Sequence, residues 1–251
     1  MNKIAAMTTG GAMLGRVRAA LYEYTQVGVS PSEIEAHARK LIKAEGAELS
    51  FTKVPGYSWA TCININDGVV HGIPTSTTPL KNGDLVTVDV GVYYKGYHTD
   101  AAFTKVVGTA TTSQVRFLRA GMEGLKNAIS AVKPGNYIGD ISVAMDTTVK
   151  KYGYSCTKEL TGHGVGRELH EEPMISNVIV GSREKTPLIE VGSTLAIEII
   201  YVEGSPSLVM EEDNWTISTK DGKMAAVHEE TVVVTDDGCS ILTTPTLFQI
   251  T

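Results

Sequence analysis

The chain has no excess of positive charge. Its 22 Lys and Arg residues are outnumbered by 28 Asp and Glu residues, so the net charge is −6. A surface of this sign disfavours contact with nucleic acid phosphates, although it is compatible with peptides and small molecules. We therefore expect no nucleic-acid partner.

Cysteines are few, and long apolar runs are missing. Cys62, Cys156 and Cys239 are an odd number, far apart, which excludes a disulfide framework and a cysteine zinc site. We expect free thiols in a reducing compartment, with Cys156 and Cys239 as small buried apolar residues. No apolar run has transmembrane length, and the N-terminal segment develops no signal-peptide core. We expect a cytoplasmic protein with no membrane partner.

No low-complexity segment, charge block or Pro/Ser-rich linker marks a domain boundary, so we expect residues 1–251 to form a single domain. Hydrophobic periodicity predicts mixed helices and strands, and the sequence PSE is a good helix start. The predicted helices cover about 12–26, 31–45, 113–131 and 138–151. The predicted strands lie near 60–66, 84–93, 97–107, 155–163, 193–202, 214–219 and 224–235, followed by a short tail.

Two parts of the chain repeat one pattern. GDLVTVD at 83–89 matches GSTLAIE at 192–198, and each segment has a carboxylate at the same distance after a glycine. Strand alternation puts the large apolar residues on one face and the carboxylate on the other. This pattern predicts two pseudo-symmetric halves, roughly 1–110 and 111–251, with a carboxylate from each half at the centre. The same spacing relates Gly28, Ile34 and Gly46 to Gly135, Ile141 and Gly153.

The predicted hairpin LVTVDVGVYYKGYHTDAAFTKV at 85–106 has an aspartate on each arm. A turn near 94–96 would place Asp89 and Asp100 directly or diagonally opposite each other. Two buried carboxylates at that distance repel, and one would stay protonated unless a divalent cation lies between them. A longer turn that points one aspartate to solvent is the alternative.

Three further groups could join these acids. His163 lies between two glycines, which let the backbone approach a bulky site, and imidazole is a common metal ligand. Glu198 interrupts an apolar strand, and either Glu229 or Glu230 would face inward at the head of another. An oxygen-rich set with one imidazole suits a pair of cations such as Mn, Co, Fe or Zn.

The ordered motifs resemble those of the pita-bread metallopeptidases, and within them type I methionine aminopeptidase. They are HGIP at 71–74, D-x10-D at 89–100, GHGVGRELHEEP at 162–173, AIE at 196–198 and E-x-T at 229–231. The resemblance covers essentially the whole chain. It implies an α/β (α+β) pita-bread fold, in which two pseudo-symmetric halves share a central curved antiparallel sheet with helices outside.

The resemblance also implies an activity and a site. The activity is that of a metal-dependent methionyl aminopeptidase, a monomeric hydrolase that removes N-terminal methionine from peptides and nascent proteins with two divalent cations (Co, Mn, Fe or Zn). Glu198 would transfer the proton, and Glu230 would face away. The implied metal ligands are Asp89, Asp100, His163, Glu198 and Glu229. The implied substrate contacts are His71, His170, Tyr57, Cys62 and Trp215, of which His71 and His170 are also catalytic.

The sequence departs from the best-known bacterial members around the expected substrate pocket. Phe51, Val54 and Leu169 stand where those members often have Cys, Tyr and Phe, and IIYVEG replaces the common Pro-Met run after Glu198. The pocket would stay apolar, so we still expect a methionine-sized substrate. One missing apolar contact changes the discrimination by about 1–3 kcal/mol.

The short interval between Glu198 and Glu229 leaves no room for the helical insertion of type II enzymes, and we expect no zinc-finger or leader domain. One alternative is a proline-directed exopeptidase of the same fold, such as prolidase or aminopeptidase P, which HGIP disfavours. Another is a catalytically inactive pita-bread binding module, which the five filled ligand positions disfavour. We expect the remaining histidines, His37, His98 and His228, to be structural or exposed. Of the three, His98 is the one that we expect to support a metal ligand.

Overall fold

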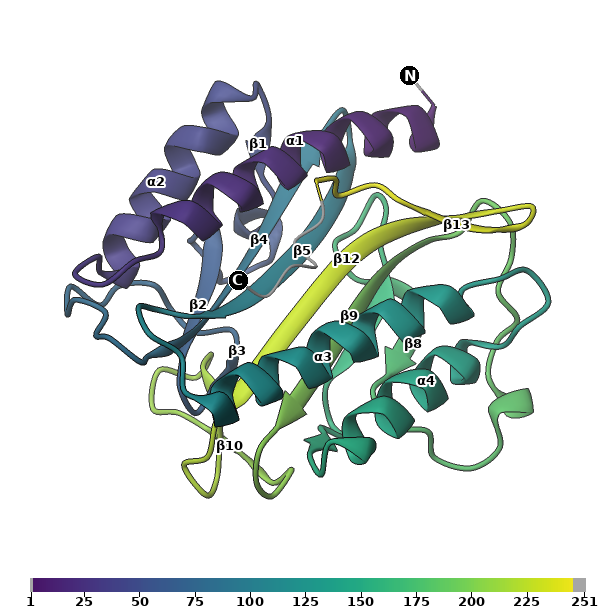
Figure 1. The fold of residues 1–251 in the computed structure, drawn as a ribbon. Helices are drawn as coiled ribbons and strands as arrows, with labels where there is room; N and C mark the ends of the chain where they lie inside the picture. Colours follow the sequence, from purple (N-terminus) through teal and green to yellow (C-terminus); the bar gives the residue numbers. More distant parts are fainter. Residues whose placement is uncertain (1, 246–251) are drawn as a thin grey trace.

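The structure is a computed structural model that describes residues 2–245. Helices lie on the outside of a curved layer of strands, and none of the described helices is long and apolar enough to cross a membrane (Figure 1). The helices are α1 (Lys3–Tyr24), α2 (Pro31–Ala44), η1 (Phe51–Lys53), α3 (Thr112–Ala131), α4 (Ile138–Lys151) and η2 (Arg183–Lys185). The strands are β1 (Glu48–Leu49), β2 (Thr61–Ile65), β3 (Gly68–Val70), β4 (Leu85–Tyr94), β5 (Tyr97–Val106), β6 (Ser155–Cys156), β7 (Thr161–Gly164), β8 (Glu171–Ser176), β9 (Thr194–Val202), β10 (Leu208–Met210), β11 (Ile217–Thr219), β12 (Ala225–Thr235) and β13 (Gly238–Ile241).

All strand pairs are antiparallel, and two long hairpin-like pairs form the centre. β4 pairs with β1, β2 and β5, whereas β9 pairs with β6, β7 and β12. The strands β10, β11 and β3 form a smaller sheet. α1 packs on β4 and β5, and α3 packs on β9 and β12, so the two parts of the chain repeat one arrangement (Figure 1). This agrees with the predicted α/β (α+β) architecture.

The backbone reproduces the predicted repeat. The matched glycines take the same left-handed conformation, which residues with a side chain rarely adopt. Four of them lie in the loops that flank α2 and α4, and the other two lie just before β4 and β9. The φ angles are 90° and 74° at Gly28 and Gly46, 86° and 83° at Gly135 and Gly153, and 93° and 86° at Gly83 and Gly192. The division of the chain near residue 110 stays a prediction.

The apolar faces of β4 and β9 anchor two separate cores. Each core packs one central strand against the helices of its own part of the chain. Burying one such aliphatic side chain contributes about 1.5–3 kcal/mol, which fixes which strand face points outward to the helices. The buried residues are Val86, Val88 and Val90 in β4 and Leu195, Ile197 and Ile199 in β9. The opposite face of each strand is therefore left for Asp89 and Glu198.

The prediction for α1 was wrong at its start. The helix begins at Lys3, where the side chain of Asn2 accepts a hydrogen bond from the Ala5 N–H, and not near residue 12. Its glycines lower helix propensity, so the sequence pattern hid the first turns. They are needed because a Cβ at Gly11 would lie 2.5 Å from the Leu242 carbonyl oxygen, and one at Gly15 would overlap Thr244. The C-terminal segment therefore runs directly across α1.

Other differences concern short strands. The predicted strand at 155–163 is divided into β6 and β7, and the strands β1, β3, β8, β10 and β13 had not been predicted. Most of these strands have two to four residues, too few to show an alternating pattern. The tail after β12 contains β13, because the chain turns back after Thr235 and pairs Val234 with Cys239.

Threonine hydroxyls join β5 to β12, where the two central pairs meet. Thr104 Oγ1 donates to the Val227 carbonyl at 2.7 Å and accepts from the Val227 N–H at 3.0 Å. From β12, Thr231 Oγ1 donates to the Asp100 carbonyl at 2.8 Å and accepts from the Asp100 N–H at 2.9 Å. Two side chains thus satisfy buried backbone groups that no strand pairing serves at this seam.

Replacing either hydroxyl should destabilise the fold. Thr104→Val and Thr231→Val keep the side-chain shape but leave buried backbone groups unpaired, which costs about 1–3 kcal/mol. Urea unfolding of each variant measures this change. Thr235→Val is the control, because its hydroxyl bonds only to Asp237 near the end of β12. A loss at Thr104 no larger than that at Thr235 would contradict the role of the seam.

Candidate active site and metal centre

Asp89 and Asp100 lie diagonally across the β4–β5 hairpin. Asp89 is opposite Ala102, two residues beyond Asp100, so both carboxylates share one face. The turn is tight: Lys95 and Gly96 have φ angles of 51° and 90°, as in the two-residue turns that suit twisted hairpins. The diagonal form of the prediction is correct, and the alternative with a longer turn is wrong.

The second central pair, β9 and β12, and the neighbouring strand β7 bring three more groups to the same place. Glu198 on β9 is directly opposite Glu229 on β12, and His163 on β7 is opposite Ala196. One ligand atom each from Asp100, His163 and Glu229 lie within 4.8 Å of one another. Strands from both parts of the chain therefore place acids and an imidazole around one point.

Two of these acids have carboxylate oxygens without a partner in residues 2–245. Asp89 Oδ1 and both carboxylate oxygens of Glu229 are buried and accept no hydrogen bond from the described residues. Burial raises the pKa of Asp89 to about 7. Burial, and then repulsion by neighbouring acids, raises the pKa of Asp100, Glu198 and Glu229. A buried carboxylate without a partner costs several kcal/mol, and divalent cations would remove that cost.

His163 is prepared to act as a neutral ligand. Its Nδ1 can donate to the carbonyl of Gly164 at 2.9 Å, which leaves the lone pair of Nε2 free. Burial, together with the nearby His170, lowers the pKa of His163 to about 4. The flanking glycines are required, because a Cβ at Gly162 would lie 2.6 Å from the Ala196 carbonyl oxygen. The donor set of four carboxylates and one imidazole fits hard or borderline divalent cations.

A cavity of about 290 Å³ opens onto this centre. Its acidic end contains Asp89, Asp100 and Glu198, and its other end is apolar. There the ring of Tyr57 meets that of Trp215 edge to face, with centroids 5.0 Å apart. The apolar walls are Phe51, Val54, Tyr57, Cys62, Leu169 and Trp215, which include the three residues predicted to reshape the pocket.

Two exposed histidines line the same cavity. The ring of His170 lies 4.5 Å from that of His163, centroid to centroid. His71 has a φ of 58°, a left-handed conformation that is uncommon for residues with a side chain and is frequent at functional sites. Both imidazoles can therefore reach a molecule bound beside the acids.

The cavity contains every predicted site residue except Glu229, which is buried beneath it. The cavity is also lined by residues that were not predicted, among them Glu159, Leu160, Thr161 and Met174. The first three directly precede the GHG motif, so their position next to a predicted ligand was the available clue. Glu230 faces away from the acids, as predicted, but it is buried and forms an ion pair with Arg18.

The other histidines have structural contacts. His37 stacks on Tyr24 with ring centroids 4.2 Å apart, and His228 is buried on the helix-facing side of β12. His98 is buried two residues before Asp100, and its Nδ1 lies 2.7 Å from Ser50 Oγ. A supporting role for His98 stays a prediction. The three cysteines are free, as predicted, although Cys239 is only half-buried.

Comparison with known proteins decides the family. The model of metallopeptidase family M24 matches residues 5–236. The chain belongs to metallopeptidase family M24. It is 40% identical to the methionine aminopeptidase of Aquifex aeolicus over 227 residues, which are 88% of each chain.

Solved structures show the same fold. The methionine aminopeptidase of Thermotoga maritima superposes with a TM-score of 0.93 at 36% identity, covering 96% of each chain. Prolidase from Pyrococcus furiosus gives a TM-score of 0.75 at 25% identity, covering 98% of this chain and 64% of its own. The predicted pita-bread fold is confirmed. Membership of family M24 implies the use of divalent metal, in agreement with the unpartnered acids.

Removing metal should destabilise the protein, most strongly at high pH. The folded metal-free state raises the pKa of Asp89 from 3.8 to about 7, so the stability due to its protonated form is present at low pH and lost as pH rises through that range. We expect dialysis against a chelator to lower the melting temperature more at about pH 8 than at about pH 5. Equal melting with and without Mn²⁺ at both pH values would contradict this expectation.

Proposed function

We propose that the protein is a methionine aminopeptidase, which removes the N-terminal methionine from peptides and nascent proteins as a cytoplasmic monomer. One observation supports the proposal most strongly: a single cavity is lined both by buried acids and by an apolar cluster that contains aromatic rings. An N-terminal methionine has the matching parts, which are an amine and amide beside an unbranched apolar side chain. The similarity to the Aquifex aeolicus enzyme supports the same substrate class.

Asp89, Asp100, His163, Glu198 and Glu229 would hold two divalent cations. The candidates are Co, Mn, Fe and Zn, since carboxylates and imidazole bind all four. Once bound, such cations lower the pKa of water and polarise a carbonyl group. The buried position of Glu229 and the half-exposed positions of Asp89 and Glu198 leave one side of the centre open to the cavity.

Glu198 is the proposed general base. It lines the cavity beside Asp89 and Asp100, and a carboxylate in this place can accept a proton from a water molecule bound at the centre. In hydrolysis Glu198 would accept the proton of the attacking water and return it to the leaving amine. Glu198 lies at the centre of β9, directly opposite Glu229 on β12.

The two exposed histidines are the proposed substrate contacts. His170, with its ring beside that of His163, would donate a hydrogen bond to the carbonyl oxygen as negative charge develops there. His71 would contact the scissile amide on the leaving side. Tyr57, Cys62 and Trp215 would form the methionine pocket together with Phe51 and Leu169.

Peptide cleavage tests the substrate class. Enzyme stripped of metal and reconstituted with Mn²⁺ or Co²⁺ should release Met from Met-Ala-Ser and leave Ala-Pro peptides intact. Cleavage of only the Ala-Pro peptides would show a proline-directed exopeptidase, and cleavage of neither would show a binding module. In Asp100→Ala, elemental analysis should find less bound metal and activity should be lost.

His170→Gln tests the role of the exposed imidazole. The variant should keep the metal content of the wild type, because the proposed ligands are untouched. It should lower kcat by about 10²–10³-fold, the usual effect of removing an oxyanion donor. A variant with normal kcat would contradict the proposed contact with the carbonyl.

A further inference from the structure

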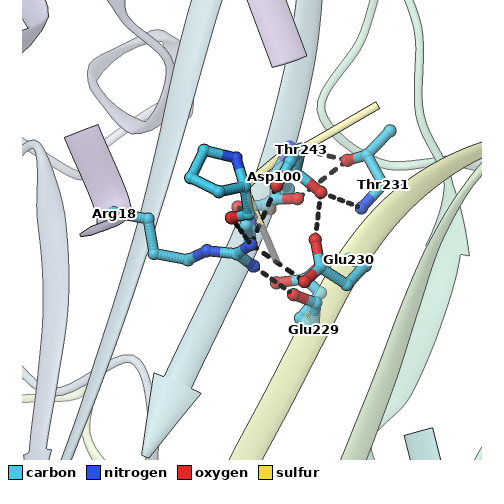
Figure 2. A network of polar contacts seen from close by, with 8 residues as sticks. Arg18, Asp100, Glu229, Glu230, Thr231 and Thr243 are labelled. Carbon is cyan, nitrogen blue, oxygen red and sulfur yellow. Dashed lines mark hydrogen bonds and ion pairs between the residues drawn. The ribbon is translucent and has the colours of Figure 1, made fainter. Parts of the chain in front are cut away.

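Arg18 lies on the wrong side of its helix for a charged residue. It is 1% exposed and sits between Leu14, Val17 and Leu21 on the buried face of α1. Its guanidinium reaches across to β12 and the C-terminal segment (Figure 2). A charge buried this deeply requires partners that compensate for lost hydration.

The guanidinium has four acceptors in different directions. Nη1 donates to the Glu229 carbonyl at 3.0 Å. Nη2 lies 2.8 Å from Glu230 Oε1, 2.8 Å from the Thr243 carbonyl and 3.1 Å from the Pro245 carbonyl. The other carboxylate oxygen of Glu230 accepts from the Thr243 hydroxyl (Figure 2). One side chain of α1 therefore holds the backbone of a proposed metal ligand.

The edge of β12 that faces away from β9 explains why Glu229 needs the hydrogen bond from Arg18. Val227 and Thr231 point their backbone groups to the same edge of β12 as Glu229, since alternate residues share an edge. Val227 is satisfied by Thr104, whereas Thr231 is satisfied by Leu242 and Thr243. Glu229 lies between them, between the two threonine contacts with β5 and before Val232, where pairing with β13 begins. At this position Arg18 supplies the donor for the Glu229 carbonyl.

We infer that Arg18 is a positioning residue for the metal centre, holding Glu229 in place through its backbone carbonyl and through Glu230. The carboxylate of Glu229 accepts no hydrogen bond from the described residues, so its direction is set by the strand that bears it. The inference rests on the proposed function, because it takes Glu229 as a metal ligand. It adds a long-range contact, from α1 to the C-terminal segment, that controls metal affinity.

Two variants separate positioning from simple charge pairing. Arg18→Lys keeps a positive charge beside Glu230, but a single ammonium group lacks the planar fork that serves Glu229 and Glu230 together. The double variant Arg18→Met/Glu230→Met removes both charges, and replacing a buried ion pair with apolar residues is often neutral for stability. Both variants are expected to fold, but neither can hold the Glu229 carbonyl as Arg18 does.

Calorimetric titration of metal-free protein with Mn²⁺ gives the decisive readout. Both variants should bind Mn²⁺ about 10- to 100-fold more weakly, the usual effect of losing a group that orients a metal ligand. At saturating Mn²⁺ the KM for Met-Ala-Ser should match that of the wild type, because no cavity residue has changed. Lost activity should return as Mn²⁺ is raised.

Two controls account for stability and for surface charge. Thr104→Val weakens the seam at Val227 and leaves the contacts of the Glu229 carbonyl unchanged, and Arg16→Met, on the same helix as Arg18, removes a surface ion pair with Glu45. Both should bind Mn²⁺ as the wild type does. A lower melting temperature with unchanged Mn²⁺ affinity in both Arg18 variants would overturn the inference. Failure of the wild type to cleave Met-Ala-Ser, with its Mn²⁺ affinity intact, would instead contradict the proposed substrate.

Discussion

Four carboxylates repel one another at the centre of the molecule, and the rest of the structure holds them there. Asp89, Asp100, Glu198 and Glu229 would separate, or become protonated, in a chain free to relax. Two apolar cores, each packed on the back of a central strand, prevent that movement. In the proposed metal centre, divalent cations between the acids would offset this repulsion, so metal binding would stabilise the folded state.

The pseudo-symmetry of the fold brings the acids together, because the same arrangement of a strand and its helices occurs twice. Each half supplies a central strand with one acid on its inner face, and the seam between the halves is made by one threonine from each side. The symmetry is broken where the chemistry requires it. His163 comes from the second part of the chain, whereas most of the apolar cluster around Tyr57, including Phe51 and Cys62, comes from the first.

Most residues of the candidate site could be predicted from the sequence, because they are charged or polar residues at positions where a strand usually has apolar ones. An aspartate inside a valine-rich strand and a histidine between glycines are visible without a structure, and period-2 alternation then fixes their faces. Arg18 could not be assigned in the same way. Its partners Glu230 and Thr243 are distant in sequence, and the only clue was a charge on the apolar face of α1. The early turns of α1 were hidden because its glycines serve packing against the C-terminal segment, which local propensity does not reveal.

We propose that the four acids and His163 form a two-cation centre. A crystal of the protein grown with Mn²⁺, measured at the manganese absorption edge, tests it most directly. We expect two anomalous peaks enclosed by Asp89, Asp100, His163, Glu198 and Glu229. Absence of any peak among these side chains in crystals that hold Mn²⁺ would contradict it.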